Sequence, residues 1–265
     1  MHIYLVQIML MIYLIGGMNS EYIVAFDIET TGLDRSKDQI IQISLAKFDS
    51  ETYEIIDIFD SYVQPVGNYS IGLAGYFKHG VKPEFLKDKP HFKDIAQDII
   101  DFIGDNDILG YNSCRFDIPF LKCELNKYGY DIDFTKRKCY DSFNEENRRN
   151  GNSLEKTFER YVGNSMLTEG LEAHNSLSDI KATITVFKYQ NKTNTVTPVP
   201  MFGEDGIIQE KEFRGELKPC FTIGKYSSLS VEFVAEIDQS YLKWVISDKC
   251  SFTQSTKDFV KQYIK

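Results

Sequence analysis

The sequence is poor in cysteine, in basic charge and in long apolar runs. It has no C-x-x-C pair and only five scattered cysteines, which argues against a disulfide framework or a cysteine-rich zinc site and indicates a reducing, cytoplasmic location. Acidic residues outnumber basic ones by 39 to 30, for a net charge of −9, and such a chain is poorly suited to coating a phosphate backbone. A hydrophobic fraction of 42% over 265 residues is typical of globular proteins and excludes collagen, bulk disorder and coiled coil.

The longest apolar run, Ile3–Ile15, lies in an N-terminal extension of residues 1–17. A membrane-spanning helix needs roughly 20 apolar residues, so this run is short, and it lacks the positive start and cleavage site of a signal peptide. We therefore expect no membrane partner, and we favour Met18 as the natural start of the protein. An extra strand or helix on the core, or a peripheral membrane anchor, are the alternatives.

Hydrophobic periodicity predicts an α/β domain over residues 18–190. Three β-branched or alternating segments follow one another with short turns, which is typical of an antiparallel meander. Strands then alternate with amphipathic helices, and this order predicts a mixed β-sheet flanked by helices. The predicted strands are Tyr22–Asp27, Gln39–Phe48, Thr52–Val63 and Asp107–Tyr111, and the predicted helices are His91–Gly104, Phe116–Tyr128, Ser153–Val162 and Asp179–Tyr189.

A linker and a second, smaller unit are expected after this domain. The segment Asn191–Pro200 is rich in Asn, Thr and Pro, so residues 191–214 are interpreted as a linker. Residues 215–265 are predicted to form a small, mostly helical C-terminal domain, with a strand and turn at Phe221–Tyr226 and helices at Val231–Ile237 and Tyr241–Ile246.

Asp27 and Glu29 lie two residues apart at the end of the first predicted strand. The strand period of two places both side chains on one face, where two carboxylates repel each other unless a cation lies between them. Hard oxygen ligands of this kind suit Mg²⁺ or Mn²⁺. Asp49 and Glu51 have the same spacing, so the buried strand before Asp27 is what distinguishes the first pair.

Two further segments carry polar groups at the starts of predicted helices. Asp117 follows the strand at 107–111, and the end of such a strand is where α/β sheets collect ligands, although an Asp there can also simply cap its helix. His174 precedes Asp179 by five residues, at the start of the next predicted helix. Each segment alone is a weak signal, because Asp is common in this chain and a solitary His is usually a surface residue.

In combination and in this order, the three segments resemble the DnaQ-like 3′-5′ exonucleases of the DEDDh group. The resemblance covers Tyr22 to Gln190: FDIETTGL at 26–33 is similar to the first family motif, Asn112, Phe116 and Asp117 to the second, and His174 and Asp179 to the third. Tyr111 stands where the family often has His, and Ser176 where it often has Ala. The resemblance implies an RNase H-like fold.

The resemblance also implies a two-metal-ion hydrolase. Asp27 would touch both divalent ions, Mg²⁺ or Mn²⁺, with Glu29 and Asp179 completing one and Asp117 supporting the other, and His174 would be the general base. Two such ions supply the nucleophile, charge neutralisation and leaving-group help that phosphodiester hydrolysis needs. The remaining site residues would bind substrate: Thr30, Thr31 and Gly32 hold the 3′-terminal nucleotide, Leu33 wedges against its base, Asn112 positions the site, and Phe116 is either a stacking surface or core.

The C-terminal segment, with GKY at 224–226 and YLKW at 241–244, resembles the small domain attached to exodeoxyribonuclease X-like proteins and is expected to recruit a DNA polymerase or other replication partner, or to hold substrate. Outside this segment, Lys136-Arg137-Lys138 and Arg148-Arg149 are candidates for contacts with substrate phosphates, although runs of charged residues are more often solvent-exposed faces.

The predicted function is a 3′-5′ exonuclease that releases nucleoside monophosphates from single-stranded DNA in proofreading or repair. The alternatives are a 3′-5′ exoribonuclease of the same family and a non-catalytic nucleic-acid-binding or polymerase-binding subunit. The sequence retains all four carboxylates, which disfavours the non-catalytic alternative.

Overall fold

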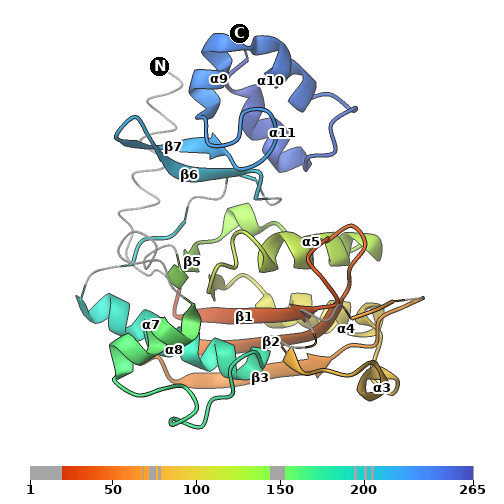
Figure 1. The fold of residues 1–265 in the computed structure, drawn as a ribbon, viewed down its shortest axis with the longest axis vertical. Coiled ribbons are helices and arrows are strands. Elements are labelled where there is room, and N and C mark those ends of the chain that lie inside the picture. The colour runs from red at the N-terminus through yellow and green to blue at the C-terminus, as the bar shows by residue number, and fades with distance from the viewer. Residues whose placement is uncertain are drawn as a thin grey trace.

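The computed structural model describes residues 20–67, 69–71, 76, 79–143, 153–193, 196–199, 202–203 and 206–264. The N-terminal extension 1–17 and the basic pair Arg148-Arg149 lie outside the described residues. The described residues form two units, an α/β unit that contains the predicted site and a smaller C-terminal unit (Figure 1). Within the described part of the chain, no helix has the length and apolar character that crossing a membrane requires.

A five-stranded mixed sheet is the centre of the first unit. Its strands are β1 (Tyr22–Thr30), β2 (Ile40–Asp49), β3 (Ile55–Tyr62), β4 (Asp107–Gly110) and β5 (Cys139–Asp141), in the spatial order β3-β2-β1-β4-β5. The first three strands pair antiparallel, and β4 and β5 join parallel. The sheet confirms the predicted mixed topology, and β5 is a strand that the sequence analysis did not predict.

Helices cover both faces of this sheet, which explains why β1 is buried along almost its whole length. Val24, Phe26 and Ile28 of β1 pack against α4 (Phe92–Ile103) and α5 (Asp117–Lys127) on one face. Ile23 and Ala25 point the other way and pack against α8 (Ser176–Thr193), which lies beside α7 (Leu154–Val162). Two short helices, α3 (Pro83–Leu86) and η1 (Phe134–Lys136), complete the unit. The architecture is the predicted RNase H-like one.

The C-terminal unit begins earlier than the sequence analysis expected. Residues Ile208–Phe213, within the expected linker, form β6, which pairs along its length with β7 (Glu216–Phe221). The reason is hydrophobic, because Ile207 and Ile208 are buried in the core of this unit. Three helices pack on the hairpin: α9 (Val231–Ile237), α10 (Gln239–Val245) and α11 (Gln254–Lys261).

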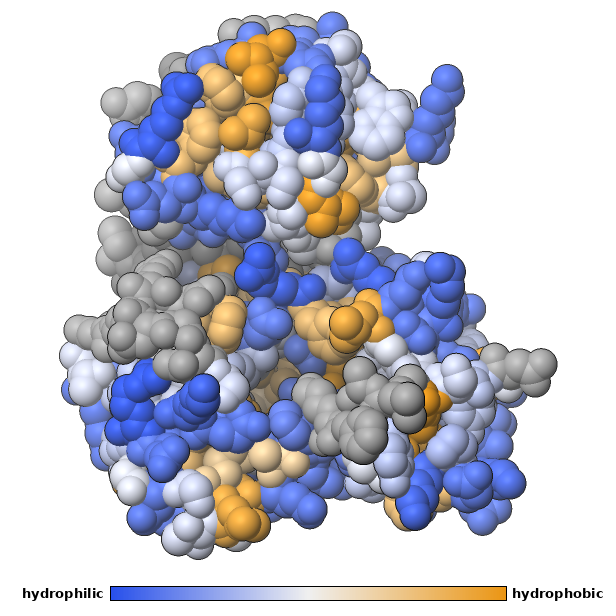
Figure 2. Space-filling view, in the orientation of Figure 1, coloured by the Kyte–Doolittle hydropathy of each residue, from blue (hydrophilic) through white to orange (hydrophobic). Residues whose placement is uncertain are grey.

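The linker also starts later than expected, because α8 continues to Thr193. Between the two units lies a cleft of about 520 Å³ that is lined on one side by Lys122 and Lys136 and on the other by Phe202 and Phe259. Figure 2 shows the molecule narrowing between the units, with polar residues over much of this face.

Candidate active site

Strand β1 delivers the first two carboxylates to the face covered by α8. Ile23 and Ala25 pack against that helix, and the period of two continues the same face to Asp27 and Glu29. Asp27 lies opposite Ser44 in β2, Glu29 lies opposite Gln42, and the register shifts directly after Glu29. Beyond the shift the strand leads into the turn at Thr31, so Glu29 is buried at the rim of the sheet.

Asp117 reaches the same rim from the start of α5, which follows the neighbouring strand β4. β4 pairs with β1 only as far as Ala25, which leaves the Ile28 N–H beyond the end of the ladder. The Oδ1 atom of Asp117 accepts a hydrogen bond from this N–H at 3.1 Å. The carboxylate at the start of α5 therefore lies beside the strand, between the positions of Asp27 and Glu29.

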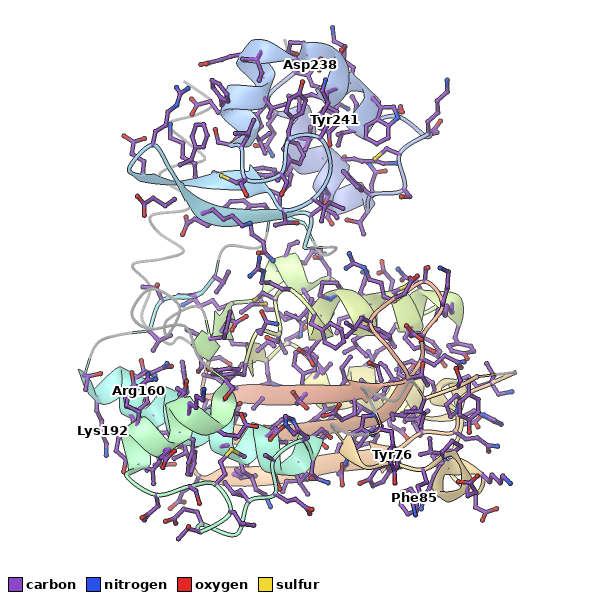
Figure 3. The ribbon with its side chains drawn as sticks, viewed as in Figure 1. Tyr76, Phe85, Arg160, Lys192, Asp238 and Tyr241 are labelled. Carbon is purple, nitrogen blue, oxygen red and sulfur yellow. The ribbon has the colours of Figure 1, made fainter. Side chains whose placement is uncertain are left out.

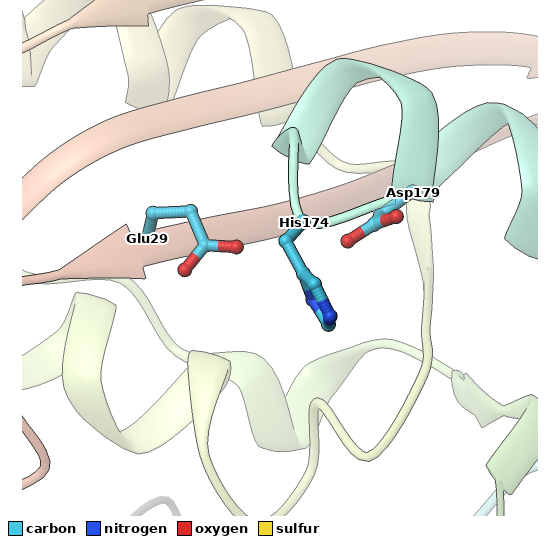
Figure 4. Close-up of side chains that lie close together, drawn as sticks. All are labelled: Glu29, His174 and Asp179. Carbon is cyan, nitrogen blue, oxygen red and sulfur yellow. The ribbon is translucent and has the colours of Figure 1, made fainter. Parts of the chain in front are cut away.

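The start of α8 completes the cluster. Glu29, His174 and Asp179 each offer a ligand atom, and these atoms all lie within 4.8 Å of one another. Figure 4 shows the three side chains around one space, with Glu29 coming from β1 and the other two from the loop and first turn of α8. Carboxylate oxygens and one imidazole at this separation can hold a divalent cation.

The electrostatics of this rim disfavour an anionic Asp117 when no cation is bound. Burial raises the pKa of Asp117 to about 7, and the charges of Asp141 and Glu29 act in the same direction, while the Ile28 N–H opposes them. A carboxyl that is buried beside other carboxylates is stabilised either by a proton or by a cation. The site therefore favours positive charge from solution, as a metal centre requires.

Asp141, at the end of β5, supports this arrangement, and the sequence analysis missed it. Its buried carboxylate accepts hydrogen bonds from the backbone N–H groups of Asn112 at 2.8 Å and Cys114 at 3.2 Å. Both amides belong to the loop that leads from β4 to Asp117. Asn112 has φ of 64°, in the left-handed region that Asn tolerates better than most residues. Asp141 thus holds the backbone turn at Asn112.

Gly110, at the end of β4, is required by the same loop. A Cβ atom at this position would lie 2.2 Å from the Cβ of Ser113, far inside van der Waals contact. Any larger residue would displace the loop that delivers Asp117.

The loop before α8 is held by contacts that the sequence did not reveal. His174 has φ of 63°, and its Nε2 atom lies 3.3 Å from the Oε1 atom of Glu155 in α7. Two residues later, the buried hydroxyl of Ser176 hydrogen-bonds Ser44 of β2, and Ser44 donates in turn to Asp60 of β3 at 2.6 Å. The start of α8 is thereby tied to the sheet behind the carboxylates.

The predicted substrate residues form the turn after β1. The Thr30 hydroxyl donates to the Gly32 carbonyl at 2.6 Å, and the Thr31 hydroxyl donates to Asp38 at 3.1 Å. A Cβ atom on Gly32 would lie 2.5 Å from the Asp38 carboxylate, so a larger residue would displace this carboxylate from its hydrogen bonds to Thr31 and Asp34. Leu33 is 84% exposed, which leaves its side chain available to a ligand.

Phe116 is partly buried against the core and contacts the ring of Phe120 at 5.6 Å between centroids, which favours the packing interpretation of this residue.

Two of the basic residues that were expected to contact phosphate have other surroundings. Arg137 donates to the carbonyls of Gly104 and Asn106, just after α4, and Lys138 is buried. Neither side chain is therefore placed as an exposed phosphate contact.

Comparison with known proteins gives a family match over most of the first unit. The family model described as Exonuclease matches residues 24–187. DNA polymerase III subunit epsilon of Buchnera aphidicola subsp. Baizongia pistaciae is 25% identical over 84% of this chain and 91% of its own length. The PolC-type DNA polymerase III of Caldanaerobacter subterraneus subsp. tengcongensis is 24% identical over 78% of this chain, which spans 14% of that longer protein.

Among solved structures, E. coli Exonuclease I in complex with a dA16 oligonucleotide matches with a TM-score of 0.58 and 21% identity, over 66% of this chain and 41% of that one. This likeness shows the fold. The C-terminal unit, from Ile208 onward, lies beyond the residues that the family model matches.

Replacing Asp117 by Asn tests the electrostatics of the metal-free site. Because the folded pKa of about 7 exceeds the unfolded value of about 4, the wild-type protein loses stability as pH rises from about 4 to about 7. In chelator at pH 8, Asp117→Asn should raise the free energy of unfolding, by at most about 4 kcal/mol, and the gain should vanish near pH 4. Urea unfolding at both pH values measures this, and an Asn variant that is less stable at pH 8 would contradict it.

Replacing Ser176 by Ala tests the tie between α8 and the sheet. The change removes the hydrogen bond to Ser44 and should lower the free energy of unfolding by about 1 kcal/mol. Ser178→Ala, on the same turn but outside this network, is the matched control and should change stability by less than half as much. Equal unfolding midpoints for Ser176→Ala and the wild type would show that the tie does not stabilise the fold.

Proposed function

Because the chain belongs to the Exonuclease family, whose model matches residues 24–187, we propose that it is a metal-dependent 3′-5′ exonuclease acting on single-stranded DNA. The observation that carries the proposal is the convergence of Glu29, His174 and Asp179 within 4.8 Å. Asp117 is bonded to the backbone beside Glu29, and Asp27 lies on the same strand face. This donor set matches the chemistry of phosphodiester hydrolysis.

The residues present fit divalent cations. Four carboxylates provide hard oxygen ligands, and a buried carboxyl whose pKa is raised to about 7 gains from a cation in place of a proton. Asp27, Glu29 and Asp179 would hold one ion, and Asp27 and Asp117 a second. Mg²⁺ or Mn²⁺ bound there would supply charge neutralisation on the phosphate and a more acidic water.

The chain's own residues perform the remaining steps. His174 has its Nε2 atom 3.3 Å from Glu155, and this carboxylate orients the imidazole that takes a proton from the attacking water. The turn of Thr30, Thr31 and Gly32 holds the terminal nucleotide beside the carboxylates. The exposed Leu33 packs against the terminal base.

DNA is the favoured substrate. The family relatives include a subunit of DNA polymerase III that this chain covers over 91% of its length, and a neighbour of similar fold is a complex with a dA16 oligonucleotide. We infer a role in proofreading or repair in the cytoplasm, with the C-terminal unit contacting a replication partner. Incubating a 3′-labelled oligodeoxynucleotide and its RNA counterpart with Mg²⁺, Mn²⁺ or chelator tests this. Release of nucleoside monophosphates from RNA in preference to DNA would overturn the choice of substrate.

Asp27→Ala should abolish hydrolysis while leaving the fold intact. Asp27 would contribute to both cation sites, so its loss should lower the rate by at least about 10³-fold, as removal of strong transition-state stabilisation does. Product release from the labelled oligodeoxynucleotide measures the rate, and circular dichroism checks the fold. Equal activity of wild type and variant, after removal of contaminating nuclease, would refute the site.

His174→Ala should lower turnover by about 10²- to 10⁴-fold, the usual contribution of a general base. The four carboxylates remain, so Mn²⁺ affinity measured by calorimetry should stay close to that of the wild type. A collapse of Mn²⁺ affinity in this variant would mean that His174 is a ligand.

A further inference from the structure

An exposed aromatic side chain, Phe85, is connected to the candidate active site through Tyr62 and Asn175. It belongs to α3, whose other large apolar residue, Leu86, is fully buried and packs with Ile41 and Val81. Leu86 thus anchors the helix, whereas Phe85 stays 49% exposed. Packing does not explain a half-exposed phenylalanine, because exposing its ring to water forgoes the free energy of burial.

The ring of Phe85 is held in a fixed place that connects to the site. Its centroid lies 4.8 Å from that of Tyr62, with the rings nearly perpendicular at 88°. The Tyr62 hydroxyl accepts a hydrogen bond from the Nδ2 atom of Asn175, the neighbour of His174, at 3.4 Å. Figure 3 shows Phe85 at the periphery of the α/β unit, on α3. Phe85 is therefore a fixed, outward extension of the active-site surface.

The sheet register gives the offset of this surface from the carboxylates. Glu29 pairs with Gln42, and Gln42 pairs with Tyr62, so the three residues form one row across β1, β2 and β3. Two strand spacings amount to about 10 Å. Phe85 contacts Tyr62 at the far end of this row, so a strand that runs from the carboxylates along the row would meet Phe85 with an internal nucleotide.

The segment that carries Phe85 is locally basic in an acidic chain. Residues 82–89 contain three lysines and two acidic residues, a net charge of +1 in a protein of net charge −9. The Nζ atom of Lys89 lies 4.3 Å from the Phe85 centroid, and Lys82 and Lys87 are exposed on either side. An exposed ring with lysines around it is the combination that binds single-stranded nucleic acid through base stacking and phosphate contacts.

We propose that Phe85, supported by Tyr62 and flanked by Lys82, Lys87 and Lys89, is a stacking platform for an internal base of the single-stranded substrate. The proposal rests on the proposed function, because it takes the carboxylate site as the place of the terminal phosphodiester. The platform binds the strand that remains after each cleavage. It contributes substrate affinity and leaves the hydrolytic step to the carboxylates and His174.

The test compares a substrate that has internal bases with a substrate that has none. Phe85→Ala should raise KM for a dT12 oligonucleotide about tenfold, a typical loss for one stacked base, and should leave hydrolysis of the p-nitrophenyl ester of thymidine 5′-monophosphate unchanged. Phe85→Tyr keeps the ring and should retain the wild-type KM. Trp244→Ala removes an aromatic of similar exposure, 44%, from the C-terminal unit and is the matched control.

A second series locates the base. In dT12 oligonucleotides with one abasic position, the effect of Phe85→Ala should disappear when one internal nucleotide, and not the 3′-terminal one, lacks its base. Equal losses of kcat/KM on dT12 and on the ester would overturn the platform. An unchanged KM for dT12 would also overturn it and would leave a protein partner as the occupant of this surface.

Binding separates failure of the platform from failure of the proposed function. If the wild type hydrolyses neither substrate, the exonuclease assignment fails, and fluorescence anisotropy of labelled dT12 still tests the platform. A Kd raised about tenfold in Phe85→Ala supports it, and an unchanged Kd overturns it.

Discussion

Mutual repulsion of carboxylates at the rim of the sheet is the constraint on which this structure depends. Glu29 and Asp117 are both buried, and Asp179 lies within 4.8 Å of Glu29. Neighbouring carboxylates do not hold one another in place, because their charges repel, so contacts from outside the cluster must position them. The Ile28 N–H holds Asp117, and the hydroxyl of Ser176 ties the helix that carries Asp179 to β2. Contacts outside the cluster therefore hold these carboxylates close together despite their mutual repulsion.

Both loops that deliver these carboxylates use left-handed backbone at a residue other than glycine. Asn112 and His174 have φ of 64° and 63°, a conformation that costs roughly 1–2 kcal/mol for most residues and less for Asn. Each loop has its own carboxylate partner: Asp141 accepts the Asn112 N–H at 2.8 Å, and Glu155 contacts the His174 ring. Strain of this kind persists only where the surroundings fix the backbone, which explains why two acidic residues outside the motifs support the site.

The sequence was sufficient for the long elements and for the carboxylate motifs, because both depend on short-range patterns. β1, α4 and α5 were predicted to within a few residues, β1 from a continuous apolar run and α4 from a single apolar stripe. β5 was missed because a strand of three residues is too short to show a periodic pattern of apolar residues. The Ser44–Ser176 contact joins residues 132 apart, and no local pattern encodes such a pair. Asp141 and Glu155 were missed for the same reason, as their partners are fixed only by tertiary structure.

Charge explains how an acidic protein can bind a polyanion. The net charge is −9, and the carboxylate rim repels phosphate until cations occupy it. Cation binding reverses the local sign, and a phosphate placed there adds further anionic ligands for the cations. By linkage, each ligand raises the affinity for the other by the same factor. The lysines beside Phe85 provide attraction that does not require the cation. In the proposed function, the strand would be bound in two places with different physical origins: the terminal phosphodiester through cations at the carboxylates, and an internal base by stacking on Phe85 beside the lysines.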